Sequence, residues 1–448
     1  MRWNVKILSV ALTAAFAACS GFAATAQECI SLVPAVGDED PRIVSAHNAL
    51  GIYVPELTPN VQPLHFPTYL GRWGTTRSRE LALATAVGSR GDCPVLAIGE
   101  SNRLTPVQLN GPCAGEPFQG FMIDAATDRL GQHIAFTADF PVRPGFVANP
   151  GKPQVFLWSM SNDVITQITD GTATGTVGLR PSLAREGSLI AFAANGDLTG
   201  QNPDGSFEVF LRDIGTGQLT QVTNGVGCDS GTIGKDGIEG PSISEDGTRI
   251  AFASNCDLTG GNPQRLQTVF LADMNLGTTI QLAHCPGCTI ADLPAVSRDG
   301  NTVLNYDVSG FASTSVVRLM VHTIGSGRAT TRSLCQPISS GQLSLGEALV
   351  LFSPFNAPAV TENGHRIAFA MKGNPTGANP TGFFEVFVMD MAADLRSGKV
   401  RQITDGTDYA ASFGLALDWK GSRLWTWGTY PGLSRGSQEI LRVSLREP

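Results

Sequence analysis

Charged residues are scarce in this chain, and the positive ones never cluster. Only 16% of the 448 residues are charged, and 31 Lys and Arg stand against 39 Asp and Glu, which gives a formal net charge of −8. Proteins that bind nucleic acid present a basic patch or stripe to the phosphates. Because the sequence has no basic run, it gives no indication of a nucleic-acid partner.

The short motifs of several enzyme classes are missing as well. The sequence has no H-E-x-x-H, no phosphate-binding P-loop and no dinucleotide fingerprint. Residues 432–436 fit G-x-S-x-G by letter, but a nucleophile elbow needs a strand-to-helix turn and a His downstream. All six His residues come earlier, the last being His365, so the sequence argues against a serine hydrolase.

Long apolar runs are absent apart from one near the start. Residues 7–18 are apolar, Arg2 and Lys6 precede them, and a small-residue cleavage motif ends at Ala26. This run is too short to cross a bilayer, and no later run is long enough. The pattern predicts a signal peptide over residues 1–26, cleavage after Ala26 and a periplasmic or secreted product.

A second interpretation places the cleavage before Cys19, because residues 16–19 resemble the signal of a bacterial lipoprotein. Phe16 stands where that signal usually has Leu, so a lipid anchor at Cys19, with an outer-membrane lipoprotein as the product, is the less favoured interpretation. Cleavage after Ala26 removes two cations and no acids, which leaves 29 Lys and Arg against 39 Asp and Glu.

The 3.6-residue apolar spacing of helices is absent too, and a repeat of short strands takes its place. Residues 241–257, PSISEDGTRIAFASNCD, are typical of a strand, a tight turn and a second strand. The Ile-Ala-Phe triplet starts at Ile134, Ile190, Ile250 and Ile367, with gaps of 56, 60 and 117 residues. The last gap spans two periods, because a degenerate copy of the triplet lies at residues 303–305. Units of about four strands at this period are typical of propeller blades.

The repeat resembles the TolB-like, WD40-type β-propeller family, whose blades carry Pro-x-x-Ser-x-Asp-Gly-x-x-Ile-Ala-Phe. The resemblance extends from about residue 121 to the C-terminus. The usual Trp after the Pro is replaced by Ser182, Ser242 and Ala295, which suggests a divergent branch. The resemblance implies an all-β propeller and, as for TolB, a protein or peptide partner.

We therefore expect six to seven four-stranded antiparallel blades, with seven the preferred count. Residues 27–120 are expected to hold an N-terminal strand and a degenerate first blade, and residues 121–448 the TolB-like blades. The last unit supplies three strands, and an open sheet edge invites aggregation. We expect an N-terminal strand to close the ring, with residues 30–33 as the donor.

Eight cysteines remain after the signal peptide, an even number that favours disulfides in an oxidising compartment. Cys228 precedes the first strand of its blade and Cys256 follows the second, so antiparallel pairing brings both to the same end, and we predict a disulfide between them. For Cys285 and Cys288 a local disulfide is preferred to a redox pair or half a zinc site, because no βαβ pattern and no second C-x-x-C accompany them.

Long connections are expected on one face of the ring. In an antiparallel meander, the connections from strand two to strand three and from blade to blade leave the same end of the sheet, and both are long here. Elaborated loops on a rigid scaffold are where binding usually occurs. Three of these loops share Thr-Gly-x-Asn-Pro, and their candidate binding residues are Asp197, Asn202, Asp204, Asp257, Asn262 and Asn379.

These loops have two interpretations. Closely spaced Asp and Asn oxygens suit Ca²⁺, whereas Asx turns and glycines that shape the backbone explain the same residues. The third copy has no acidic residue, so the structural interpretation is preferred and no metal or cofactor is expected. As a further hypothesis, Asp139 and Asp307 join Asp197 and Asp257 in a ring of carboxylates at the channel mouth, because all four follow strand two of successive blades.

The sequence thus predicts an exported, non-catalytic scaffold that binds a protein or peptide in the cell envelope. The alternative is an extracellular carbohydrate-active hydrolase or lyase that uses carboxylates on the long-loop face. A scaffold leaves those carboxylates dispersed and solvated, whereas such an enzyme holds two of them about 5 to 10 Å apart in a cleft.

Overall fold

The structure is a computed structural model of the chain. It describes residues 29–35, 42–48, 83–86, 95–100, 103–108, 122–128, 130–138, 142, 153–170, 178–225, 238–284, 287–310, 315–341, 357–380, 382–404, 413–418, 420–428 and 439–445. Within these ranges the only helical element is the three-residue 3-10 turn η2 (Arg185–Gly187). No helix in the described part of the chain combines the length and hydrophobicity needed to span a membrane.

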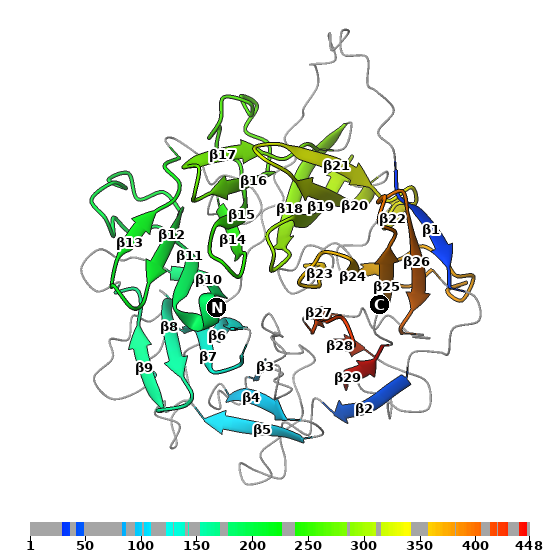
Figure 1. Ribbon diagram of the computed structural model, residues 1–448, viewed down its shortest axis with the longest axis horizontal. Helices are drawn as coiled ribbons and strands as arrows, with labels where there is room; N and C mark the ends of the chain where they lie inside the picture. The colour runs from blue at the N-terminus through cyan, green and yellow to red at the C-terminus, as the bar shows by residue number, and fades with distance from the viewer. Residues whose placement is uncertain are drawn as a thin grey trace, which may run out of the picture.

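The described strands form separate sheets that stand side by side around a central axis (Figure 1). Six sheets have four or five strands, and one has three. All contacts between consecutive strands are antiparallel, so each sheet is a blade and the chain is the all-β propeller that the repeat predicted. The blades are numbered here from 1 to 7 in the order in which they follow each other from β6.

Blades 1 to 3 are plain four-stranded meanders. Blade 1 consists of β6 (Met122–Thr127), β7 (His133–Ala138), β8 (Gln154–Ser159) and β9 (Val164–Gln167). Blade 2 consists of β10 (Gly178–Ala184), β11 (Leu189–Ala194), β12 (Glu208–Asp213) and β13 (Leu219–Gln221). Blade 3 consists of β14 (Ile238–Ile243), β15 (Arg249–Ser254), β16 (Thr268–Asp273) and β17 (Thr278–Gln281).

The other blades depart from this plan: blades 4 and 5 have a fifth strand, blade 6 takes one strand from near the N-terminus, and blade 7 has three strands. Blade 4 consists of β18 (Cys288–Val296), β19 (Thr302–Ser309), β20 (Ser315–Ile324), β21 (Ala329–Ser333) and β22 (Ser339–Gly341). Blade 5 consists of β23 (Ala359–Val360), β24 (Arg366–Met371), β25 (Glu385–Met391), β26 (Ser397–Gln402) and β1 (Ser31–Pro34). Blade 6 consists of β27 (Phe413–Leu417), β28 (Arg423–Gly428), β29 (Glu439–Ser444) and β2 (Arg42–Asn48), and blade 7 of β3 (Leu83–Ala86), β4 (Val95–Glu100) and β5 (Arg103–Gln108).

An N-terminal strand closes the ring, but it is not the predicted one. The strand β2 pairs antiparallel with β29, with Arg42 opposite Ser444 and Asn48 opposite Glu439. Residues 30–33 lie one blade earlier, where β1 adds to β26 in parallel, with Ser31 opposite Ser397. The prediction of residues 30–33 as donor is therefore wrong: Ile30 is fully buried and is held at blades 4 and 5, which leaves the edge of blade 6 to the next strand along the chain.

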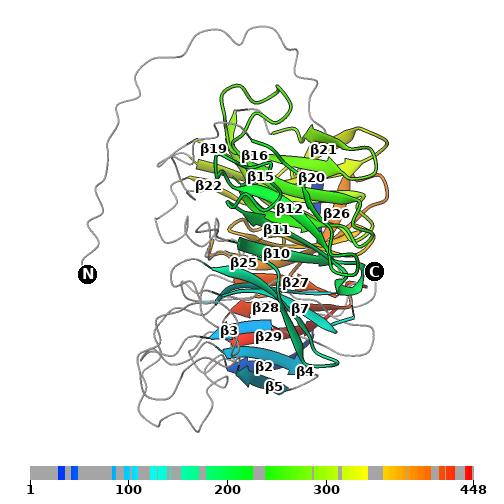
Figure 2. The same ribbon diagram turned by 90° about the vertical axis from the view of Figure 1, so that its left-hand side faces the viewer.

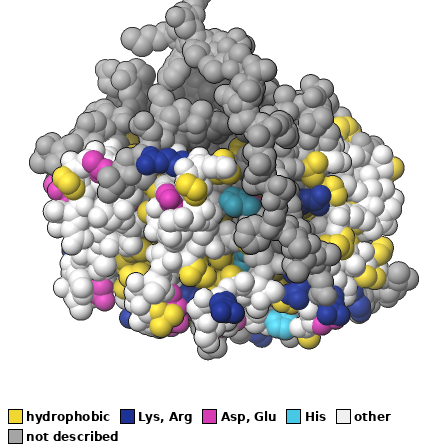
Figure 3. All heavy atoms as spheres, turned by 90° about the horizontal axis from the view of Figure 1, so that it is seen from above, with side chains coloured by type: hydrophobic (Ala, Val, Ile, Leu, Met, Phe, Trp, Pro, Cys, Tyr) yellow, Lys and Arg dark blue, Asp and Glu magenta, His cyan; other side chains and the backbone are white. Residues whose placement is uncertain are grey.

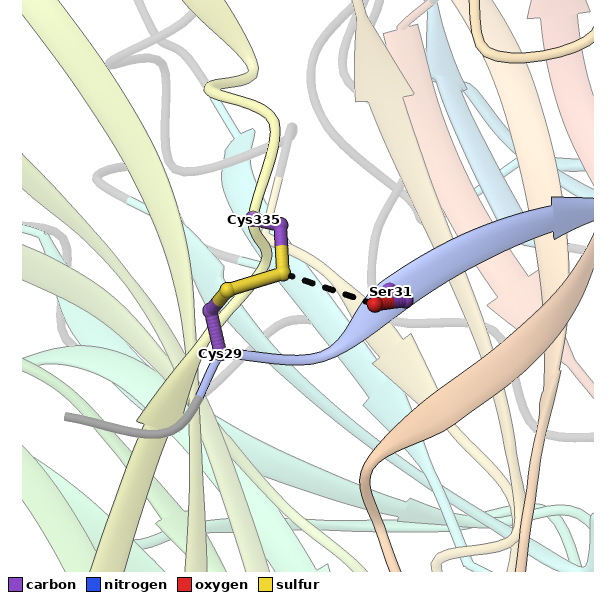
Figure 4. Close-up of a disulfide and its surroundings, with 3 residues drawn as sticks. All are labelled: Cys29, Ser31 and Cys335. Atoms are coloured by element: carbon purple, nitrogen blue, oxygen red, sulfur yellow. Dashed lines mark hydrogen bonds between the residues drawn. A yellow bond between two sulfur atoms is a disulfide. The ribbon is translucent and has the colours of Figure 1, made fainter.

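A disulfide between Cys29 and Cys335 holds the start of the described chain against blade 4 (Figure 4). On either side of it, the amide of Ile30 donates to the carbonyl of Ser333 at 2.8 Å, and the amide of Cys335 donates to the carbonyl of Ile30 at 3.0 Å. The Oγ of Ser31 lies 3.7 Å from the Sγ of Cys335. The N-terminal segment thus joins blade 4 to blade 5 at the outer edge of the ring.

Apolar residues fill the spaces between neighbouring blades. In four blades a Phe of strand two stacks on a Phe of strand three, with ring centroids 5.5 to 6.1 Å apart. One apolar cluster joins Ala135 and Val155 of blade 1 to Ile190 and Phe192 of blade 2. Further clusters join blades 2 and 3, 3 and 4, 4 and 5, and 5 and 6, so each of blades 2 to 5 buries both faces against its neighbours.

The structure explains why a glycine recurs in the first hairpin turn, where it follows Glu186, Asp246, Asp299, Asn363 or Lys420. Five of these glycines have φ between 70° and 85°, and a Cβ added to any of them would come within 3.0 Å of the side chain that opens strand two of the preceding blade. The contacts are Gly187 with His133, Gly247 with Leu189, Gly300 with Arg249, Gly364 with Thr302 and Gly421 with Arg366. Glycine is needed both for its backbone conformation and for this close approach.

The same turns are linked from blade to blade through their backbones. The amide of Arg185 donates to the carbonyl of Glu245 at 2.9 Å, and the amide of Glu245 donates to the carbonyl of Arg298 at 2.8 Å. Side chains add to these links: the Oγ of Ser242 accepts a hydrogen bond from the amide of Val296 at 3.1 Å. The amide of Asp299 also donates to the carbonyl of Glu362 at 3.0 Å, so the short turns of blades 2 to 5 are linked by backbone hydrogen bonds.

Candidate functional site

Three connections between strands two and three share one internal hydrogen-bond frame. They are residues 195–207, 255–267 and 372–384, and each holds one buried Asn, namely Asn202, Asn262 or Asn379. By the meander topology they leave the same end of blades 2, 3 and 5, opposite the short turns. They form the long-loop face, which is the candidate binding site.

The buried Asn of each loop bonds to the loop itself. The Nδ2 of Asn202 donates to the carbonyl of Ser206 at 2.7 Å and to that of Gly196 at 3.4 Å. The Nδ2 of Asn262 donates to the carbonyl of Leu266 at 2.8 Å and to that of Cys256 at 3.3 Å. The Nδ2 of Asn379 bonds in the same way to the carbonyls of residues 383 and 373. The amide clamps the two ends of each loop together.

The acidic residues of these loops also serve the frame. The Oδ1 of Asp197 accepts the amide of Asn202 at 2.8 Å, and the Oδ1 of Asp257 accepts the amide of Asn262 at the same distance. In the third loop Asn374 takes this place, again at 2.8 Å. Because a neutral amide does the same work, the interaction needs an acceptor and no charge. The Oδ1 of Asp204 accepts the hydroxyl of Ser206 at 2.9 Å.

The structure therefore does not bring the sequence-predicted residues together into one cluster. Asp197 and Asp204 are exposed in one loop and Asp257 in another, and Asn202, Asn262 and Asn379 are buried. Asp139 lies outside the described residues, as do residues 432–436. In the described part of the chain, no three His, Cys, Asp or Glu side chains are grouped closely enough to hold a metal ion.

Asp307 lies inside blade 4 instead of at a solvent-lined mouth. It belongs to β19, it is 1% exposed, and its Oδ1 accepts a hydrogen bond from the Nδ2 of Asn305 at 2.7 Å. The Oδ1 of Asn305 accepts one from the Nε2 of His322 at 2.7 Å, and the Nδ1 of His322 accepts one from the hydroxyl of Thr331 at 2.8 Å. The Nδ1 of His284, at the end of blade 3, lies 3.9 Å from the Oδ2 of Asp307.

Burial keeps both histidines of this network neutral. It lowers the pKa of His322 to about 3, with the neighbouring His284 as the smaller cause. Burial also lowers the pKa of His284 below its ordinary value. A neutral His322 that donates from Nε2 and accepts at Nδ1 satisfies both of its contacts, so the network is a structural element of the interface between blades 3 and 4.

No protein-family model and no curated protein matches the sequence. Among solved structures, TolB from Acinetobacter baumannii is 16% identical, with 76% of this chain and 67% of TolB covered and a TM-score of 0.42. An oligogalacturonate lyase in complex with manganese is 10% identical, with 86% of this chain and 90% of the lyase covered and a TM-score of 0.49. The oligogalacturonate lyase from Vibrio parahaemolyticus is 9% identical, with 91% and 99% covered and a TM-score of 0.49.

The likeness is one of fold. The propeller rests on the seven described sheets, and the partner or substrate must be inferred from this chain's own residues.

Besides Asp307, the structure contains a buried carboxylate that the sequence analysis did not identify. Glu208 opens β12 and is fully buried, where it accepts hydrogen bonds from the hydroxyl of Thr223 and, at 2.7 Å, from the amide of Gly225. Burial raises the pKa of this carboxyl, and these hydrogen bonds only partly oppose the shift. Glu385 and Thr404 repeat the contact in blade 5. The signal in the sequence was the joint recurrence of Phe-Glu-Val-Phe and Gln-x-Thr in two units.

The predicted disulfides are only partly within the described residues. Cys256 and Cys288 are both disulfide-bonded, whereas their predicted partners Cys228 and Cys285 lie outside the described residues. The disulfide between Cys29 and Cys335 was not predicted, because 306 residues separate the two cysteines and no repeat places them side by side.

Proposed function

We propose that this protein is an exported, non-catalytic β-propeller scaffold that binds a protein or peptide partner through its long-loop face. The observation that carries the proposal is the repeated frame of the three loops, in which a buried Asn fixes the backbone. A fixed backbone lowers the entropy lost on binding. Each frame leaves polar side chains such as Gln201 and Gln264 exposed for contact with a partner.

Export is supported by the chemistry of the cysteines. Cys29, Cys256, Cys288 and Cys335 are all engaged in disulfides, and such bonds persist in oxidising compartments such as the periplasm or the extracellular space. The signal-peptide pattern of residues 1–26 points to the same destination. Mass spectrometry of the secreted form tests both parts, with a mature N-terminus at Gln27 as the expected result.

The charge pattern also favours a protein partner over a polyelectrolyte. Only 16% of the residues are charged, and on the face drawn in Figure 3 the Lys and Arg side chains toward the lower right have Asp or Glu and His side chains among them. A partner would therefore be recognised through hydrogen bonds and shape, with little electrostatic steering.

The experiment is an affinity capture from cell-envelope extract with the full mature chain as bait, at matched bait density for three forms. The loop-face variant is Gln201→Lys with Gln264→Lys, and the control variant carries the same charges in short turns at the other end, Ser161→Lys with Ser326→Lys. All four side chains are exposed. We expect one partner to be retained by the wild type and the control and lost by the loop-face variant.

A parallel screen with acidic and neutral polysaccharides tests the alternative of a carbohydrate-active hydrolase or lyase. Turnover of a polysaccharide by the wild type, together with capture that the loop-face variant leaves unchanged, would contradict the scaffold proposal. Such an enzyme needs two carboxylates close together. In this structure Asp197 and Asp257 each accept a hydrogen bond within their own separate loops, which argues against the enzyme.

A further inference from the structure

The first residue of strand two faces a residue at the end of strand three, either the last one or the one before it. In blade 3 this pair is Arg249 with Asp273, and in blade 5 it is Arg366 with Asp390. In blade 2 the pair is Leu189 with Asp213. Blade 2 thus keeps the acidic member of the pair and has an apolar residue in place of the arginine.

The arginine of blades 3 and 5 fills a defined space between its own blade and the next turn. The Nη1 of Arg249 donates to the carbonyl of Gly300 at 2.8 Å and to the Oδ1 of Asn301 at 2.9 Å, and its Nε lies 3.9 Å from Asp273. Arg366 donates to both carboxylate oxygens of Asp390 and to the carbonyl of Gly421. The guanidinium sits between a carboxylate and the carbonyl of the turn glycine in both places.

In blade 2, Leu189 takes the position of Arg249 and Arg366, so it provides the aliphatic part of the side chain but no guanidinium group. It is 5% exposed and packs against Gly247 just as the Cδ of Arg249 packs against Gly300. Beyond it lies an open cleft of about 170 Å³ between blades 2 and 3, lined by Leu189, Leu211, Asp213, Gly247, Thr248 and Met274 among others. A single buried water needs only roughly 10 to 15 Å³, so the cleft has room for a guanidinium group.

The charge of the cleft suits a cation. Hydrogen bonds from the backbone and side chain of Thr216 hold the pKa of the Asp213 carboxyl below its ordinary value, so it is ionised at neutral pH. Asp213 forms no salt bridge with the described residues. Among the described residues that line the cleft, Arg185 is the one cation; its charge contributes to the lowered pKa of Asp213, and its Nε donates to the carbonyl of Asp246 at 2.8 Å.

We propose that this cleft binds the guanidinium group of an arginine side chain from a peptide or protein partner. The carboxylate of Asp213, the carbonyl of Gly247 and the hydroxyl oxygen of Thr248 offer acceptors where Asp273, Gly300 and Asn301 offer them to Arg249. Leu211 and Met274 provide apolar walls for the flat faces of the group. A lysine ammonium fits less well, because it lacks the planar fork of donors.

This site is separate from the long-loop face. Asp213 ends β12 and Gly247 lies in the first hairpin turn of blade 3, so the cleft opens at the short-turn end of the ring. The proposal therefore does not depend on the function proposed for the loops, and either can fail without the other.

The test is a titration of the full chain with N-acetyl-arginine amide, N-acetyl-lysine amide, ethylguanidinium and free arginine, followed by calorimetry. We expect millimolar or tighter binding of N-acetyl-arginine amide and about tenfold weaker binding of the lysine compound. Tighter binding of N-acetyl-arginine amide than of free arginine supports a partner side chain. Binding of free arginine or ethylguanidinium alone would point to a small metabolite and overturn the assignment to a peptide.

Three variants make the test specific. Leu189→Arg supplies the missing guanidinium from within and should weaken binding about tenfold or more while the fold is kept, since blades 3 and 5 carry arginine there. Asp213→Asn should weaken binding similarly, and Arg185→Ala should tighten it, because a competing cation is removed. Failure of the wild type to bind, or equal affinity of the wild type and Leu189→Arg, overturns the proposal.

Discussion

At the scale of single residues, the most informative positions are Asn202, Asn262 and Asn379. Each is buried, and each donates two hydrogen bonds that close a loop on itself. The exposed Asp197 and Asp257 are interchangeable with a neutral Asn374, so the most acidic residues of the motif are its least essential ones. The chemistry of this face lies in its backbone and exposed amides more than in its carboxylates.

Replacing Asn202 with Ala should therefore unlock one loop without affecting the ring. The change leaves the buried carbonyls of Gly196 and Ser206 without their donor, which costs about 1 to 3 kcal/mol. Chemical denaturation measures the loss, and hydrogen exchange should show faster opening confined to residues 195–207. Gln201→Ala is the matched control, since that side chain is exposed, and a similar loss in both variants would refute the role of Asn202.

The buried His322 should make the stability of the protein depend on pH. Its pKa is about 3 in the fold and about 6.5 when unfolded. Between these values the unfolded chain binds a proton that the folded chain does not, so the free energy of unfolding rises with pH from about 3 to about 6.5 and this contribution is constant above. One such group gives a slope of up to about 1.4 kcal/mol per pH unit.

Denaturant unfolding of the wild type and of His322→Gln across this window tests the prediction. Gln does not titrate, so the variant should show a shallower slope below pH 6.5. His365→Gln is the control, because His365 is exposed. Identical slopes for wild type and His322→Gln would contradict a neutral, buried His322.

At the scale of elements, the strand β1 and its disulfide join two blades that the repeat alone would leave independent. The backbone of Ile30 bonds to blade 4 and that of Ser31 to residue 396 of blade 5, beside Cys29 and Cys335. Since the disulfide closes a loop of 306 residues, removing it should cost about 2 to 5 kcal/mol.

Cys29→Ser, Cys335→Ser and the double variant form a cycle that tests this link. All three should lose about the same stability in thermal or chemical unfolding, because either single change breaks the same bond. Additive losses in the double variant would show that the two cysteines act independently.

The sequence predicted the strands and turns whose residue pattern recurs in every blade of the repeat. The Asp-Gly turn places a glycine of positive φ against the preceding blade, and the Ile-Ala-Phe strand fills the interface, so both recur wherever a blade does. The parts that were not predicted occur once. β1 and β2 compete for two open edges with similar strand sequences, and only the burial of Ile30 and the distant Cys335 decide between them.

The candidate site shows the same division. The repeated Thr-Gly-x-Asn-Pro marks the three loops, and in the structure the Asn of each loop makes the same hydrogen bonds. The network of His284, Asp307 and His322 and the cleft beside Leu189 arise from departures from the repeat, and such a departure in a single blade has no pattern to identify it.

At the scale of the whole molecule, the fold is a ring whose ends are joined by pairing of β2 with β29 (Figures 1 and 2). The pairing of β2 with β29 covers the open edge that blade 6 would otherwise present. The rigidity on which the long-loop face depends follows from this closure.

The most direct test of closure is an engineered disulfide across the joined ends. Ala46 and Leu441 are opposite each other in the pairing of β2 with β29, whereas Leu32 pairs with Gly398 in blade 5. We predict that Ala46→Cys with Leu441→Cys forms a crosslink within one chain, identified by peptide mass spectrometry, and that Leu32→Cys with Leu441→Cys does not. A crosslink from residue 32, or one that forms only between chains, would contradict the closed ring described for this protein.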